Sequence, residues 1–268
     1  MIKRILSIFF FLISSLSFSQ LSKNHYIPPI SSGPSNADPL DQLMYISTPS
    51  QGDVNFTINI VGGNSISGTV SNATPYVYGI ADSGYSSFVQ DPATTSRITS
   101  DKGYIINADS PIYVSVRLNA GGNAQAGALV SKGENALGTT FRIGTYDNQG
   151  SPGSNYLNFF SLMATDDNTT VNLTNERVTS GLQIQNAGAQ QFPINNISLN
   201  RGQTYVVAVK PQDTNENRAG LIGTLVSSDK PIVVNSGSAN GSFGNGGARD
   251  YGIDQIVELS KVGKEYIF

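Results

Sequence analysis

Asp109-Ser110-Pro111-Ile112-Tyr113-Val114 and Asp229-Lys230-Pro231-Ile232-Val233-Val234 share one pattern, Asp-x-Pro-Ile-x-Val, and lie 229 − 109 = 120 residues apart in a chain of 268. In each copy the Asp and the Pro favour a turn, and the β-branched residues after the Pro favour extended backbone. We therefore predict a turn followed by a strand at both places. We therefore expect the chain to be an internal duplication of one β-rich unit.

Two further matches support this period. Val54-Asn55-Phe56-Thr57 returns as Val171-Asn172-Leu173-Thr174, 171 − 54 = 117 residues later. Residues 138–143, which we expect to close the first copy, return as residues 263–268, 263 − 138 = 125 residues later. Apolar and polar residues alternate over 54–60, which is the period of a strand with one buried face.

The predicted fold is all-β, with two similar β-sandwich-like lobes from an internal duplication of about 120 residues. Helical periodicity is limited to residues 253–259, at most two turns. We place the first lobe at 44–160 and the second at 161–268. Because residues 266–268 fall inside a predicted strand, we expect the polypeptide to continue beyond Phe268.

The first 43 residues are interpreted separately from the lobes. Lys3 and Arg4 precede an apolar run and a small-residue exit at Ser19, which is typical of a secretory signal peptide over 1–19. Residues 20–43 are rich in proline and show no strand or helix period, so we predict an extended leader. The sole histidine, His25, is expected to be solvated there.

Composition excludes several classes of function. Cysteine is absent, so an exported protein of this size depends on packing and strand pairing, as in bacterial export. The formal net charge is −3, and removal of Lys3 and Arg4 gives −3 − 2 = −5, with the charges scattered. Nucleic acid and membrane surfaces are therefore not expected as partners, and no segment after the signal peptide is expected to enter a membrane.

The chemical inventory for catalysis is small. With no cysteine and one histidine, cysteine nucleophiles, Ser-His-Asp triads and the usual zinc sites are excluded. The glycine clusters lack the lysine of a phosphate-binding loop and the spacing of a dinucleotide fingerprint. Residues 213–217 carry oxygen-bearing side chains at alternating positions, as a calcium-binding loop does. Arg218 occupies the position where such a loop needs glycine, so we expect a polar turn. We predict no cofactor and no metal.

Paired carboxylates leave one catalytic alternative open. Asp250, Asp254 and Glu258 are spaced to align on one face of a helix. The structural interpretation is a solvated face beside an acidic loop. The catalytic alternative is a carbohydrate hydrolase that uses Asp250 with Asp254 or Glu258, since a glycosidase needs only two carboxylates.

Candidate ligand-binding residues lie at the end of the glycine-rich segment 235–259, where the second copy carries an insertion. They are Arg249, Asp250, Tyr251 and Asp254. Insertions on a repeated scaffold fall in surface loops, where binding residues collect. Four tyrosines near glycine-rich loops form either a binding platform or core and rim packing: Tyr85, Tyr146, Tyr156 and Tyr251.

Several stretches resemble a known family. The string Ala164-Thr165-Asp166-Asp167-Asn168-Thr169-Thr170-Val171, together with residues 199–205, 223–234, 254–259 and 263–266, is similar to the N-terminal domain family named after the IgG Fc-binding protein. The resemblance covers roughly residues 118–268 well and the first copy faintly. It implies a module of large secreted surface proteins, including those of gliding bacteria that use type IX secretion, with no enzymatic activity.

The expected function is a non-enzymatic extracellular or cell-surface binding and adhesion module of a larger secreted bacterial protein. Its partner would be a glycan or a protein, recognised by loops at one end of the scaffold. Two alternatives remain open, a purely structural stalk and the carbohydrate hydrolase described above.

Overall fold

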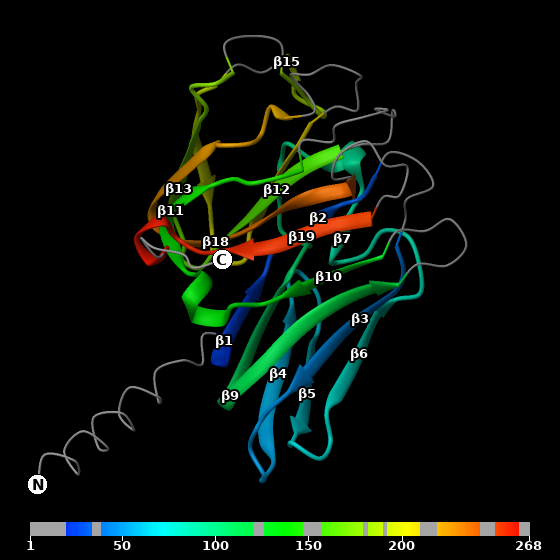
Figure 1. Cartoon of the computed structure of the whole chain (residues 1–268). Coiled ribbons are helices and arrows are strands. Elements are labelled where there is room, and N and C mark those ends of the chain that lie inside the picture. Colours follow the sequence, from blue (N-terminus) through cyan, green and yellow to red (C-terminus); the bar gives the residue numbers. More distant parts are fainter. Residues whose placement is uncertain are drawn as a thin grey trace, which may run out of the picture.

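Two large β-sheets, of seven and eight strands, form the fold of the computed structural model. The structure describes residues 20–33, 39–119, 126–146, 157–178, 182–189, 192–209, 219–241 and 250–262. These residues form strands and short 3-10 turns, which confirms the all-β class. The sheets build two bodies, called here lobe 1 and lobe 2, the lower and upper parts of Figure 1. In the described ranges no helix has the length and apolarity to cross a membrane.

Lobe 1 is built around its longest strand, β9, which pairs with four others in antiparallel fashion. The path β5-β4-β9-β3-β6 forms its sheet, with β1 and β10 also on β9. Its strands are β1 (Ser22–Ile27), β3 (Leu40–Ser47), β4 (Val54–Ile60), β5 (Ser65–Val70), β6 (Tyr76–Ala81), β9 (Tyr104–Asn119) and β10 (Gly127–Val130). The short β2 (Ile30–Ser31) and β7 (Val89–Gln90) pair in parallel, and η2 (Pro92–Thr94) follows β7.

Lobe 2 repeats this arrangement around β18. The path β16-β13-β18-β12-β17 forms its sheet, β11 and β19 also pair with β18, and β8 (Ile98–Thr99) extends the β17 edge. Its strands are β11 (Gly138–Arg142), β12 (Leu157–Ala164), β13 (Thr169–Thr174), β16 (Ile194–Leu199), β17 (Thr204–Ala208), β18 (Leu225–Gly241) and β19 (Asp250–Ile256), with a small pair β14 (Gln183–Ile184) and β15 (Gly188–Ala189). Strand for strand, the two paths match, so the predicted duplication into two lobes is confirmed.

The repeated Asp-x-Pro motif lies inside β9 and β18, so the predicted turn is wrong. Before the proline, β9 pairs with β4 and β1, and after it with β3 and β10, apart from the isolated Ser22 to Ile112 pair. β18 changes from β13 and β11 to β12 and β19 at the same point, apart from the isolated Gly138 to Ile232 pair. A proline is tolerated there because the strand passes between two layers and needs no ladder hydrogen bond at the corner.

Strand pairing also refines the other two sequence matches. β4 and β13 do correspond, but Phe56 pairs with Ala108 while Val171 pairs with Ser228, 228 − 108 = 120 residues on. Val171 therefore corresponds to Phe56, two residues after its sequence match, and a shift of two keeps the same face. Residues 138–142 form β11, which pairs with β18 and so opens lobe 2 instead of closing lobe 1. Residues 263–268 lie outside the described ranges.

Buried apolar side chains form one core in each lobe, and the lobe 1 core extends into lobe 2. Phe56 of β4 packs edge to face on Tyr76 of β6, with ring centroids 4.9 Å apart. Leu157, Phe159 and Tyr251 of lobe 2 belong to the lobe 1 core. All eight residues of β12 are buried, because Phe160 and Leu162 face the lobe 2 core while Leu157 and Phe159 face lobe 1.

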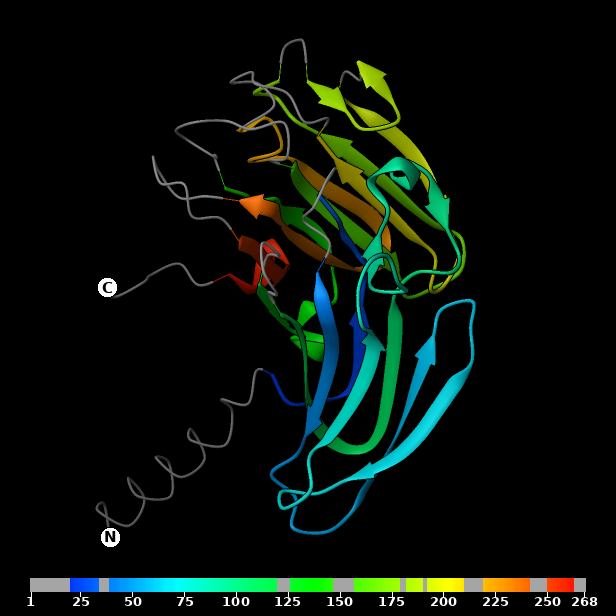
Figure 2. The ribbon, with the colours of Figure 1, turned by 90° about the vertical axis from the view of Figure 1, so that its right-hand side faces the viewer.

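The predicted leader, 20–43, is corrected by the structure. Residues 22–27 form β1, which pairs with β9, and β3 begins at Leu40. His25 was expected in solvent and is fully buried. Figure 2 shows this dark blue segment running up between the two bodies. It lies there because the gap between the lobes needs apolar residues, and Ile27 and Ile30 supply them with no exposed surface.

The strand pairing does not support the predicted boundary between the lobes at 160/161. That point falls inside β12. Apart from β8, which pairs with β17 of lobe 2, lobe 1 runs from β1 to β10 and lobe 2 from β11 to β19, and η3 (Gly133–Ala136) joins them. A second 3-10 turn, η4 (Leu259–Lys261), follows β19.

Candidate binding cleft

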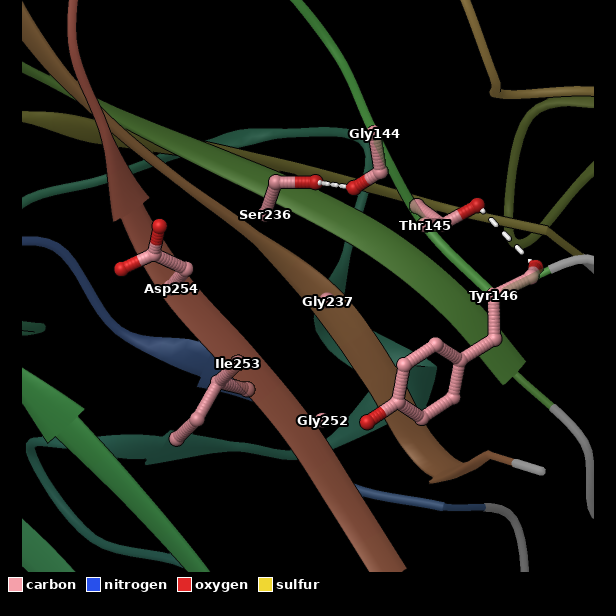
Figure 3. Close-up of a pocket in the computed structure, with 8 residues that line it drawn as sticks. All are labelled: Gly144, Thr145, Tyr146, Ser236, Gly237, Gly252, Ile253 and Asp254. Atoms are coloured by element: carbon pink, nitrogen blue, oxygen red, sulfur yellow. Dashed lines mark hydrogen bonds between the residues drawn. The ribbon is translucent and has the colours of Figure 1, made fainter. Parts of the chain in front are cut away.

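An open cleft of about 320 Å³ lies beside β19 in lobe 2. Three short segments line it: the residues after β11, the middle of β18 and the middle of β19 (Figure 3). The lining residues are Gly144, Thr145, Tyr146, Ser236, Gly237, Gly252, Ile253 and Asp254. The cleft thus combines an aromatic ring, a carboxylate, hydroxyl groups and backbone, the mixture that orients ligands in protein clefts.

Glycines create the space in which the Tyr146 ring lies. A Cβ at Gly252 would collide with the end of the Tyr146 ring, and a Cβ at Gly241 would collide with its edge. The ring therefore lies flat against the backbone of β18 and β19. Burial, and next the negative charge of Asp250, raise the pKa of the Tyr146 hydroxyl, so the ring is neutral at physiological pH.

Asp254 is the charged group of the cleft, and it has a partner from lobe 1. Lys132 Nζ lies 2.7 Å from Asp254 Oδ1 and 2.8 Å from Oδ2, and it also donates to the Gln255 carbonyl oxygen. The Asp254 side chain remains 65% exposed. Such an exposed pair contributes only about 0–1 kcal/mol to stability. Because the side chain is exposed, a ligand can compete with Lys132 for the carboxylate.

The other candidate residues hold the lobes together. Asp250 Oδ1 accepts a 2.9 Å hydrogen bond from the Ala126 amide, and the Tyr251 amide donates to the Ala126 carbonyl at 2.9 Å. The Tyr251 side chain is 5% exposed and packs over Gly127. Asp250 and Tyr251 therefore join β19 to the start of β10, whereas Asp254 lines the cleft. Arg249 lies outside the described residues.

The helix predicted around 253–259 is wrong. Residues 250–256 form β19, whose pairing with β18 overrides the weak local signal. At about 3.3 Å per residue, Asp250 and Asp254 lie roughly 13 Å apart along the strand, beyond the about 5–9.5 Å of glycosidase carboxylates. Glu258 accepts a hydrogen bond from the amide of Thr139 at 3.0 Å. This bond is the main reason why the pKa of the Glu258 carboxyl is lowered. Asp250 and Asp254 are therefore too far apart along β19 to act as a glycosidase pair.

The three described tyrosines of the predicted set lie in different environments. Tyr146 lines the cleft, Tyr251 is buried between the lobes, and Tyr85 is 49% exposed in lobe 1. Tyr156 lies outside the described ranges, as does the segment 213–217 with its alternating oxygen ligands. Within the part of the chain that the structure describes, no three acidic or histidine residues are grouped to hold a metal ion.

A buried polar network between the lobes escaped the sequence analysis. His25 Nε2 contacts two carbonyl oxygens, of Ile112 at 3.0 Å and of Ser22 at 3.2 Å. Since carbonyls only accept, Nε2 carries the proton and Nδ1 accepts from the Ser131 hydroxyl at 2.9 Å. Burial lowers the pKa of His25, and the two carbonyl contacts oppose this shift in part. The ring is therefore neutral.

Gln255 of β19 completes this network. Its Oε1 accepts from the Lys132 amide at 2.7 Å, and its Nε2 donates to the Tyr26 carbonyl at 2.8 Å. Asn235 Nδ2 donates to the Pro28 carbonyl at 2.8 Å. The buried N-terminal segment is thus held by side chains from β18 and β19 of lobe 2.

A second cavity, of about 400 Å³, lies at the corner of lobe 1. Its lining includes Leu21, Pro49 and Pro111, and no ionisable side chain. This cavity also has three hydroxyl side chains, of Thr48, Ser50 and Ser110. The cleft beside β19 has in addition an aromatic ring and a carboxylate, and so it is the stronger candidate site.

A known protein family matches the part of the chain that contains the cleft. The family described as IgGFc binding protein matches residues 126–268, which is more than half of the chain. The chain belongs to this family. The IgGFc-binding match begins at the residue before β10 and covers lobe 2 from β11 to β19, including the whole cleft lining. Membership supports an extracellular binding module. The searches of curated proteins and of solved structures found no match.

Proposed function

We propose that the chain is a non-enzymatic extracellular binding module and that its ligand enters the cleft beside β19. The observation that carries the proposal is the position of this cleft inside the region that matches a binding-protein family. Its lining brings together the Tyr146 ring and the exposed Asp254 carboxylate without a catalytic pair. A ring face and a few fixed polar groups are the usual means of orienting a ligand.

The chemistry of the lining favours a neutral ligand that donates hydrogen bonds. Asp254 only accepts, and the Ser236 hydroxyl already donates to the Gly144 carbonyl, which leaves its oxygen as an acceptor. Asp250 adds negative charge near Tyr146. Sugar hydroxyls and peptide amides fit this surface, whereas an anionic ligand would be repelled. The proposed partners are therefore a glycan or an extracellular protein.

The proposed setting is the surface of a bacterial cell. It is supported by the signal-peptide pattern of residues 1–19, the absence of cysteine and the resemblance to surface proteins of gliding bacteria. In this setting the chain is the N-terminal part of a larger secreted protein exported by the type IX route, and it contributes to adhesion. No membrane insertion is expected after signal cleavage.

A binding screen tests the proposal. The chain without residues 1–19 would be passed over immobilised IgG Fc fragment, mucin, fibronectin and neutral polysaccharides, at up to about 100 µM, where micromolar sites are filled. We expect saturable binding to at least one surface, and weaker binding to sulfated than to neutral polysaccharides. A blank response across the panel contradicts a recognition role and favours the structural stalk, for which the rigid polar network between the lobes is the supporting observation.

A further inference from the structure

The unit that connects lobe 1 to lobe 2 is repeated after lobe 2. In lobe 1, β10 is followed by η3 and then by β11, the first strand of lobe 2. In lobe 2, β19 is followed by η4. The two turns also have the same neighbours: Glu134 of η3 accepts from Asn24 of β1 at 2.6 Å, and Glu258, which precedes η4, accepts from Thr139 of β11.

Pairing registers fix which residues correspond. Leu129 pairs with Val116, and Asp254 pairs with Ser236, 236 − 116 = 120 residues on. Gly127 and Gly252 correspond in the same way, through Leu118 and Ser238. Ser22 and Gly138 both pair with the Ile of the repeated motif, so Pro28 and Pro29 correspond to Gly144 and Thr145.

In lobe 1 these positions are covered by lobe 2. Tyr251 packs over Gly127, and Leu129 is 1% exposed. The carbonyl oxygen of Pro28 accepts from Asn235, and that of Pro29 accepts from Ser161. The surface that receives the next lobe in lobe 1 is therefore the counterpart of the open cleft in lobe 2.

Two apolar side chains beside η4 are exposed where a covering lobe would lie. Val262 is 41% exposed and Leu259 is 40% exposed. By register Val262 corresponds to Leu137, which is partly buried at the entry to β11. Residues 263–268 resemble residues 138–143 in sequence, and residues 138–142 form β11, the first strand of lobe 2.

A second copy of this chain is a poor occupant of that surface. Phe159 and Tyr251 anchor lobe 2 in the lobe 1 core. Their counterparts in lobe 1, by pairing register, are Leu43 and Ala126. Arg117 also projects from this face, over the Tyr45 ring at 5.1 Å. Lobe 1 therefore lacks the aromatic anchors with which a second copy would occupy that surface as lobe 2 does.

We infer that a third lobe of the same repeat follows η4 and packs beside β19, forming the second wall of the cleft. The contact between lobe 2 and this third lobe differs from the contact between lobes 1 and 2. Asp254 and Ser236 stand where lobe 1 has Leu129 and Val116. A contact lined by a carboxylate and hydroxyl groups holds water. The contact between lobe 2 and the third lobe therefore remains a hydrated cleft. The inference does not depend on whether the cleft binds a ligand.

The test compares the polypeptide read from its gene through the next repeat with the chain of residues 1–268. We expect another Asp-x-Pro motif about 120 residues after Asp229, by the spacing of the first two copies. We also expect backbone amides at Gly252–Asp254 to exchange about tenfold more slowly in the longer protein, because packing against a neighbour suppresses local opening.

Val262→Asp separates this packing from general stability, with Val77→Asp, 49% exposed on β6, as its matched control. In the longer protein Val262→Asp should restore fast exchange at β19, and in the shorter chain it should change nothing. Val77→Asp should change neither. Absence of a third motif, equal exchange in the two lengths, or no effect of Val262→Asp in the longer protein would each overturn the inference. Ligand binding is not a readout, so failure here leaves the proposed function unaffected.

Discussion

Thr165 Oγ1 donates a 2.7 Å hydrogen bond to the carbonyl oxygen of Pro231, and the same bond joins Thr48 to Pro111 in lobe 1 at 3.0 Å. Both prolines are the corner residues of the repeated Asp-x-Pro motif. The threonine follows the end of β12 in one lobe and of β3 in the other. Each lobe therefore has a threonine hydrogen bond at the point where its long strand passes between two layers, and by pairing register the two threonines lie one position apart.

Replacement of Thr165 by valine removes this bond while it keeps the side-chain shape. The Pro231 carbonyl is then left with the longer bond from the Thr165 amide, 3.4 Å. We expect the free energy of unfolding to fall by about 1–3 kcal/mol, measured by chemical denaturation. Thr69→Val is the control, because Thr69 is exposed on β5. Equal effects of the two changes would mean that the corner bond has no special role.

Gln255 should be among the most sensitive positions between the lobes. It is fully buried, and its side chain contacts Lys132, Tyr26, Ser131 and Asn235. Gln255→Ala leaves a cavity and unpaired polar groups, so we expect a loss of roughly 2–4 kcal/mol. Thermal unfolding followed by calorimetry would measure this change. A loss below about 0.5 kcal/mol, typical of surface substitutions, would show that the network does not hold the lobes together.

The free energy of unfolding should decrease as the pH falls below 6.5, the ordinary pKa of histidine. The pKa of His25 is lowered in the folded protein from 6.5, so the unfolded chain binds the proton more readily. The contribution of the neutral ring is complete above pH 6.5 and is lost between 6.5 and the lower folded pKa, at up to about 1.4 kcal/mol for each pH unit.

The check is a series of denaturation midpoints between pH 7.5 and pH 4.5, for the protein and for His25→Gln. His25 is the only histidine, so the variant should have a flatter profile in the upper part of this range, where carboxylates contribute little. Parallel profiles for the two proteins would contradict a buried neutral imidazole.

Asp254→Asn should leave stability nearly unchanged. The pair with Lys132 is exposed on the Asp254 side, so we expect a change of about 0–1 kcal/mol. This makes the substitution a clean probe of ligand binding, since it removes charge and keeps shape. A loss of more than about 2 kcal/mol would assign Asp254 to the interface between the lobes instead.

Strand alternation and the repeated motif are enough to predict the fold class and the duplication. The proline is harder to place, because the same Asp-x-Pro signal fits a turn and a strand that changes partner at a corner. Residues 20–33 resemble a leader, since their burial depends on a second lobe that lies far away in sequence. The near-continuous apolar run of β12 is a usable signal of a strand buried on both faces.

The structure places the predicted candidate residues in different environments. Asp254 lines the cleft, whereas Asp250 and Tyr251 join the lobes. Tyr146 is one of the four tyrosines near glycine-rich loops. Its position against Gly252 depends on a neighbouring strand more than a hundred residues away, which no local pattern indicates.

The central claim is that the cleft beside β19 carries recognition. Its most direct test is a titration of the strongest partner from the binding screen against three proteins: the unmodified chain, Tyr146→Ala and Tyr85→Ala. Tyr85 is an exposed tyrosine outside the cleft lining. We expect Tyr146→Ala to weaken binding at least about tenfold, or 1.4 kcal/mol, while Tyr85→Ala binds normally. Equal affinity for all three proteins, or no saturable binding by the unmodified chain, would contradict the account.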